Sequence, residues 1–74
     1  MKVLIVGGAG EIGRYLIKDF SNHGHEVVVL DRATKTEEME KLPITYLQGN
    51  LMDAALVNGS VQGTDVIINL AWSF

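Results

Sequence analysis

A glycine-rich segment between an apolar run and an amphipathic segment constrains this chain more than any other feature. The apolar run covers residues 2–6, and residues 11–22 carry hydrophobic side chains at helical spacing. The glycines between them satisfy G-x-G-x-x-G and G-x-x-G-x-x-G together. A tight strand-to-helix turn needs residues that adopt positive φ, which glycine does without steric cost. The sequence therefore predicts a buried strand, a glycine loop and a helix.

The same loop has the chemistry of a pyrophosphate site. Phosphate oxygens can approach bare backbone N–H groups at a helix N-terminus, where the helix dipole favours negative charge. A glycine one turn into the helix lets helix and strand pack closely. The predicted cofactor-binding residues of the loop are Gly7, Gly8, Ala9, Gly10, Glu11, Ile12 and Gly13. The alternative is a glycine-rich turn that binds nothing.

The rest of the chain alternates between expected strands and expected helices. Further strands are expected at 26–30, 44–48 and 65–71. A short exposed helix is expected over 34–42, where Thr34 and Glu37 have capping-box spacing, and Pro43 ends it. A third helix is expected to begin at Asp53 and to stop at Gly63. Ile12, Leu16, Ile17 and Phe20 should form the buried stripe of the first helix, and Val66, Ile67, Ile68 and Leu70 should be buried in the fourth strand.

The predicted order is β-α-β-α-β-α-β, which indicates an α/β fold with a Rossmann-type, doubly wound parallel sheet. The last expected strand is followed by no helix within residues 1–74. Its open apolar edge would be prone to aggregation. We therefore expect residues 1–74 to be the incomplete N-terminal part of a dinucleotide-binding domain, without the catalytic and substrate portion. Either the remainder of the domain or self-association is expected to cover the fourth strand.

Asp31 and Arg32 end the second expected strand, about 20 residues after the glycine loop. A carboxylate there can accept hydrogen bonds from both ribose hydroxyls of an adenosine and repels a 2′-phosphate, which favours NAD. A guanidinium beside it can instead bind a 2′-phosphate. NAD is therefore the predicted cofactor, with NADP as the alternative.

Polar and small residues follow the later strands. Asn50 carries both a donor and an acceptor that suit the adenine amino edge, and Leu51 can pack on the adenine face. A simple turn is the alternative for Asn50. After the fourth strand, Leu70 and the small Ala71 would border a cofactor ribose or phosphate.

Composition excludes several classes of protein. A net charge of −3 argues against a nucleic-acid surface or an anionic membrane surface. No apolar run approaches the roughly 20 residues that cross a bilayer, and no signal peptide is visible. The chain has 0 cysteines, and His23 and His25 lack further ligands nearby, so no metal site is expected. A cytoplasmic location is expected.

These features together resemble the short-chain dehydrogenase/reductase superfamily, and most of all its extended branch of NAD-dependent epimerases and dehydratases. The resemblance covers the whole chain and depends on residues 6–13, Asp31-Arg32, 49–53 and 69–71. It implies an oxidoreductase-type enzyme that acts on a nucleotide sugar or a related substrate. The chain departs from the family at four positions, which are Val6, Asn50, Asn69 and Trp72.

The resemblance also implies chemistry by a Tyr-x-x-x-Lys pair, in which lysine lowers the tyrosine pKa. Neither tyrosine of this chain has that lysine, since Asp19 follows Tyr15 and Asn50 follows Tyr46 at i+4. No catalytic residue is therefore predicted. A non-catalytic NAD(P)-binding sensor is the main alternative function, and a structural half-domain that binds nothing is the other.

Overall fold

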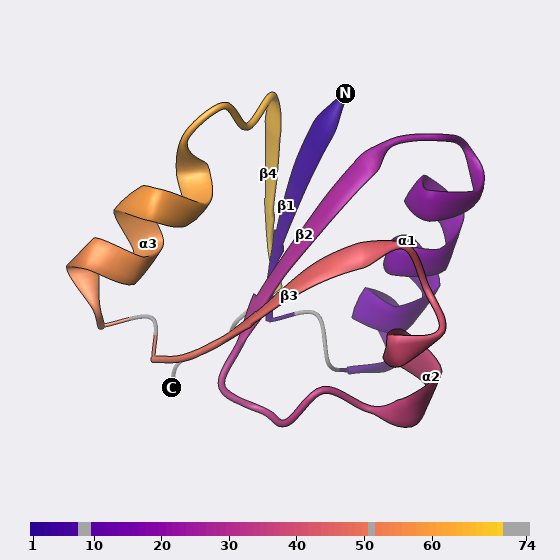
Figure 1. Ribbon diagram of the computed structural model, residues 1–74, viewed down its shortest axis with the longest axis horizontal. Coiled ribbons are helices and arrows are strands. Elements are labelled where there is room, and N and C mark those ends of the chain that lie inside the picture. The colour runs from indigo at the N-terminus through magenta and orange to yellow at the C-terminus, as the bar shows by residue number, and fades with distance from the viewer. Residues whose placement is uncertain (8–9, 51, 71–74) are drawn as a thin grey trace.

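The computed structural model describes residues 1–7, 10–50 and 52–70. Its strands are β1 (Lys2–Val6), β2 (Glu26–Asp31), β3 (Ile44–Gln48) and β4 (Val66–Asn69). They form one sheet in the order β3-β2-β1-β4, and every neighbouring pair is parallel (Figure 1). The predicted α/β architecture with a Rossmann-type parallel sheet is therefore confirmed.

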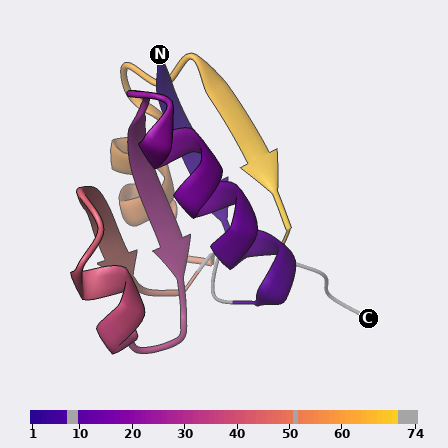
Figure 2. The ribbon, with the colours of Figure 1, turned by 90° about the vertical axis from the view of Figure 1, so that its right-hand side faces the viewer.

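Helices cover both faces of the sheet. The helices α1 (Glu11–Asn22) and α2 (Glu37–Glu40) lie on one face, and α3 (Ala54–Val61) lies on the other (Figures 1 and 2). Successive residues of a strand point to opposite faces, so each of the central strands supplies both layers. Val3, Ile5, Val27 and Val29 face α1 and α2, whereas Leu4, Val28 and Leu30 face α3.

The helix α1 has the predicted bounds, because glycines punctuate both of its ends. At its C-terminus Gly24 adopts a positive φ of 79°, and the next N–H, of His25, donates to Phe20 O at 3.1 Å. One expectation is wrong, since Ile12 is 69% exposed rather than part of the buried stripe. At 100° per residue, the buried side of α1 centres near Gly13 and Ile17, which puts Ile12 about 120° away from it.

The short helix α2 differs from its prediction in position and in burial. It begins after Thr36, whose hydroxyl accepts from Met39 N at 3.2 Å, and not at Thr34. Met39 is only 1% exposed and belongs to the same core cluster as Ile17. The helix is therefore docked on the core and is not the exposed element that its charges suggest.

The helix α3 begins as predicted. Asp53 Oδ1 accepts from Leu56 N at 3.1 Å, which satisfies one of the N–H groups that a helix start leaves without an intrahelical partner. After α3, Gly63 takes a positive φ of 71° and turns the chain toward β4.

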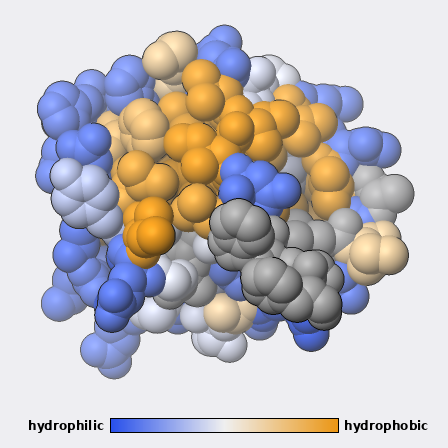
Figure 3. All heavy atoms as spheres, turned by 180° about the vertical axis from the view of Figure 1, so that it is seen from behind, coloured by the Kyte–Doolittle hydropathy of each residue, from blue (hydrophilic) through white to orange (hydrophobic). Residues whose placement is uncertain are grey.

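The strand β4 is shorter and more open than expected. It covers Val66–Asn69, and Ile67 is 55% exposed instead of buried. The reason is its place at the sheet edge, where β1 is its one neighbour among the strands of the described residues. An apolar hollow of about 330 Å³ remains on the α3 side of the sheet, lined by Leu4, Val6, Leu30, Val57, Val61, Ile67 and Asn69. Hydrophobic side chains gather over a broad area in the view from behind (Figure 3).

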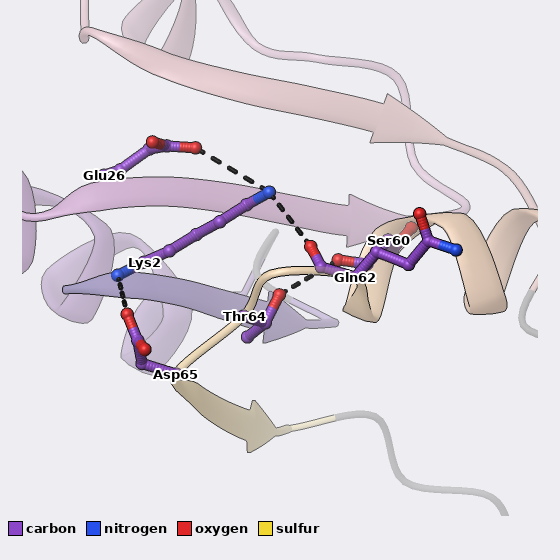
Figure 4. A network of polar contacts seen from close by, with 6 residues as sticks. All are labelled: Lys2, Glu26, Ser60, Gln62, Thr64 and Asp65. Carbon is purple, nitrogen blue, oxygen red and sulfur yellow. Dashed lines mark hydrogen bonds and ion pairs between the residues drawn. The ribbon is translucent and has the colours of Figure 1, made fainter.

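Polar contacts tie the strands together at the amino end of the sheet (Figure 4). Lys2 is their centre: its backbone N–H donates to Asp65 Oδ2 at 2.8 Å, and its ammonium donates to Gln62 O at 3.2 Å. The same ammonium lies 3.8 Å from Glu26 Oε2. These contacts fix the start of β4 against β1 at the end of the sheet opposite the glycine loop.

Candidate functional site

The carboxyl ends of all four strands meet at one edge of the sheet, as parallel pairing requires (Figure 1). Backbone hydrogen bonds continue the strand pairing one residue beyond the strands. They join Gly7 N to Leu30 O (2.8 Å), Gly49 N to Asp31 O (2.9 Å) and Leu70 N to Val6 O (2.8 Å). The start of the glycine loop, the end of β2, the turn after β3 and Leu70 are therefore neighbours. Gly8, Ala9, Leu51 and Ala71 lie outside the described residues.

Gly7 and Gly10 differ in backbone conformation, and their conformations place different demands on the residue type. Gly7 has a φ of 79°, a conformation that a side chain makes costly. Gly10 has extended backbone with φ −78° and ψ 178°, which any residue adopts. A Cβ added at Gly10 would meet no described atom within 4 Å. Neither backbone strain nor internal packing of the described residues therefore requires glycine at position 10.

The start of α1 is open to a ligand. Gly10 is the N-cap of α1 and offers no side-chain acceptor to the first helical N–H groups. Glu11 and Ile12, the first helical residues, are exposed, whereas Gly13 is buried where α1 faces the sheet. The positive end of the helix dipole and its N–H groups are thus directed to the carboxyl edge of the sheet.

Asp31 lies half-buried at the end of β2, and Arg32 after it is exposed. Asp31 Oδ1 accepts from Ala33 N at 2.9 Å, which closes a tight turn directly after the strand. A carboxylate offers about four lone-pair positions, so it can accept several hydrogen bonds at once. The structure therefore places Asp31 and Arg32 at the end of β2, where Gly7 N donates to Leu30 O at the start of the glycine loop.

The turn after β3 has the same construction. Asn50 is exposed, and its Oδ1 accepts from Met52 N at 2.9 Å. Its backbone carbonyl accepts from Asp53 N at 2.9 Å, which leads the chain into α3. A Cβ at Gly49 would overlap the Leu56 side chain, so the turn packs closely on α3. Asn50 thus shapes a turn, while the second lone pair of its Oδ1 can still meet an adenine amino group.

Two side chains of β3 contact this site and were not predicted. Tyr46 donates its hydroxyl to Ala33 O at 2.6 Å, and Gln48 Nε2 donates to Arg32 O at 3.4 Å. Burial, followed by the negative charge of Asp31, raises the pKa of the Tyr46 phenol above its ordinary value. The sequence indicated this pair only through spacing: residues 46 and 48 are two apart, so their side chains lie on one face of the strand.

A charged surface group joins α1 to α2 beside the site. Glu38 forms an ion pair with Lys18, and its Oε2 lies 3.5 Å from Arg14 Nη1. The hydrogen bond from Lys18, together with its charge, lowers the pKa of Glu38 below its ordinary value. Glu11 lines the same hollow, so two carboxylates balance the two cations there, and the group is not a strong anion site.

Among residues 1–7, 10–50 and 52–70, no helix is long and apolar enough to cross a membrane.

This arrangement defines a class of protein: an α/β chain of the Rossmann type with a glycine loop, a helix N-terminus and a carboxylate at one sheet edge. The profile of the NAD dependent epimerase/dehydratase family matches residues 3–73. The chain belongs to the NAD-dependent epimerase/dehydratase family, which confirms the resemblance seen in its motifs.

Three known proteins illustrate the similarity. Phenylcoumaran benzylic ether reductase 1 of Arabidopsis thaliana is 30% identical over 77 residues, which cover 92% of this chain and 25% of the reductase. The crystal structure of the Bordetella bronchiseptica enzyme WbmG in complex with NAD has a TM-score of 0.82 and 29% identity, and the match covers 100% of this chain and 26% of that one. A UDP-glucose 4-epimerase structure has a TM-score of 0.79 and 28% identity, over 99% of this chain and 23% of the epimerase. The chain therefore spans about a quarter of the length of these proteins.

Proposed function

We propose that this chain is the NAD(P)-binding portion of an epimerase/dehydratase-type oxidoreductase that acts on a nucleotide sugar or a related substrate. NAD is the preferred cofactor. The similarity to an NAD complex and to a UDP-glucose 4-epimerase supports the cofactor and the substrate class. In the 74 residues we assign binding residues only, because Tyr46 uses its hydroxyl on a backbone carbonyl and Tyr15 is 70% exposed on α1.

The observation that carries the proposal is the open space at Gly10. Neither the φ of Gly10 nor its described neighbours require a glycine at this position. A ligand that lies against the backbone would require one, because a side chain would occupy its place. The pyrophosphate would lie against Gly10 and the first N–H groups of α1. Asp31 would accept from the adenosine ribose hydroxyls, and its negative charge would repel a 2′-phosphate.

Calorimetric titration of the chain with NAD and NADP tests the proposal, with Gly10→Val and Gly59→Val as a matched pair. A Cβ at either glycine meets no described atom within 4 Å, but Gly59 lies in α3. We expect NAD to bind more tightly than NADP, Gly10→Val to abolish binding with an unchanged circular dichroism spectrum, and Gly59→Val to bind as the wild type does. Equal binding by the Gly10→Val variant would refute the pyrophosphate position. A folded wild-type chain that binds neither dinucleotide would refute the function for these residues.

A further inference from the structure

Three consecutive carbonyl groups at the end of β2 accept hydrogen bonds from β3 and from the residue after it. Residues 31–33 form the turn that carries the candidate ribose-binding carboxylate and the neighbouring guanidinium. Each of their carbonyl oxygens accepts a hydrogen bond from β3 or from the residue that follows it. The bonds join Gly49 N to Asp31 O (2.9 Å), Gln48 Nε2 to Arg32 O (3.4 Å) and Tyr46 Oη to Ala33 O (2.6 Å).

The hydrogen bond from Tyr46 is stronger than the one from Gln48. Its O···O distance of 2.6 Å is short for a hydroxyl donor, whereas the 3.4 Å bond of Gln48 is long and comes from an exposed side chain. The Tyr46 ring is partly buried and packs against the core cluster of Val27, Val29 and Met39. The core therefore holds the ring that carries this hydroxyl, and a phenol is a donor at neutral pH.

We propose that Tyr46 is a positioning residue for cofactor selectivity: its hydroxyl fixes the turn at 31–33 and thereby keeps Asp31, rather than Arg32, at the adenosine ribose. This inference rests on the proposed function. Asp31 and Arg32 favour opposite cofactors, so the backbone between them decides which side chain meets the 2′ position. With the turn fixed at Ala33, Arg32 cannot move its backbone to reach a 2′-phosphate. Without that bond the turn can rearrange and bring the guanidinium to the phosphate.

The test compares Tyr46→Phe with Tyr15→Phe in the 74-residue chain. Both substitutions remove one hydroxyl, but Tyr15 is exposed on α1, whereas the Tyr46 hydroxyl donates to Ala33 O. The first measurement needs no cofactor: hydrogen exchange of the Ala33 amide, which donates to Asp31 Oδ1 within the turn. The second is the ratio of the NADP dissociation constant to the NAD dissociation constant for each variant. Gln48→Leu is a third variant, and we expect it to give the same effects at smaller size.

We expect Tyr46→Phe to speed Ala33 exchange and to lower the selectivity ratio about 3- to 10-fold, the range that the loss of one hydrogen bond supports. Tyr15→Phe should change neither. An unchanged Ala33 exchange rate in Tyr46→Phe would overturn the role of Tyr46 in the turn. Faster exchange with an unchanged ratio would overturn the role in selectivity and leave the proposed function standing. If the wild type binds neither dinucleotide, the function itself fails and the selectivity inference fails with it.

Discussion

Replacement of Met39 by alanine is expected to destabilise the chain far more than its place in a short, acidic helix suggests. Met39 is 1% exposed and lies in the core cluster with Ile17, so its truncation leaves a cavity under α2. Core Met→Ala substitutions cost about 2–5 kcal/mol. A domain of this size has a free energy of unfolding of roughly 4–11 kcal/mol in all. Met39→Ala should therefore remove a large part of the stability.

The other contacts that hold α2 are too weak to conceal this effect. The Thr36 cap contributes about 1 kcal/mol, and the ion pairs of Glu38 lie at the surface, where solvent screens them. Met39 is thus the main anchor of α2. If Met39→Ala is too unstable to purify folded, Met39→Leu keeps the test measurable, because a swap that conserves volume costs less than about 1.5 kcal/mol.

Urea denaturation followed by circular dichroism measures the effect, and Met52→Ala is the matched control. Met52 is 87% exposed, so the same substitution there should change the free energy of unfolding by less than about 0.5 kcal/mol. Equal stability of the Met39→Ala and Met52→Ala variants would refute the packing of α2 on the core. A loss for Met39→Ala of at least about 2 kcal/mol agrees with it.

Two further predictions concern charge and the open sheet edge. Lys18→Met should raise the Glu38 pKa toward its ordinary value, and NMR of the carboxyl carbon measures that pKa. Because the pair lowers the Glu38 pKa in the folded state, its stabilisation is present above the unfolded-state pKa. That stabilisation is lost as the pH falls through the folded-state pKa. An unchanged Glu38 pKa would contradict the pairing. In the 74-residue chain, Ile67→Lys should reduce self-association in sedimentation experiments, because it charges the apolar hollow beside β4. Ile12→Lys is the control, since Ile12 is similarly exposed but does not line the hollow. If both variants associate equally, the hollow beside β4 is not the surface through which the chain self-associates.

Sequence alone predicted most of the fold, because its signals are local. The bounds of β1, α1 and β3 follow from apolar runs, helical periodicity and glycine or proline punctuation, and the structure has the same bounds. Glycines at 24 and 63 take the positive φ values that their positions after helices predict. Parallel pairing then places the loops after the strands at one edge, so much of the candidate site followed from topology.

The errors arise where burial depends on neighbours that are distant in sequence. A helix of four residues is too short to show a periodic apolar face, so nothing local indicated that Met39 is buried. Ile67 lies in an apolar run, yet its exposure depends on the place of β4 at the sheet edge. The bond from Tyr46 to Ala33 joins residues 13 apart through two paired strands, and the spacing of residues 46 and 48 indicates a shared face of the strand but not this partner.

The two ends of the sheet differ in a way that bears on binding. At the amino end, β1 bonds to the segment before β4: the Lys2 backbone N–H donates to Asp65 Oδ2, and the Lys2 ammonium donates to Gln62 O (Figure 4). At the carboxyl end, a polar side chain at or just beyond the end of each of two strands accepts a hydrogen bond from the backbone N–H two residues on: Asp31 accepts from Ala33 N, and Asn50 accepts from Met52 N. Such bonds form both turns without a ligand. A dinucleotide that binds at this edge would therefore meet a turn at 31–33 that is already held by hydrogen bonds, and the entropy cost of ordering that turn would be lower.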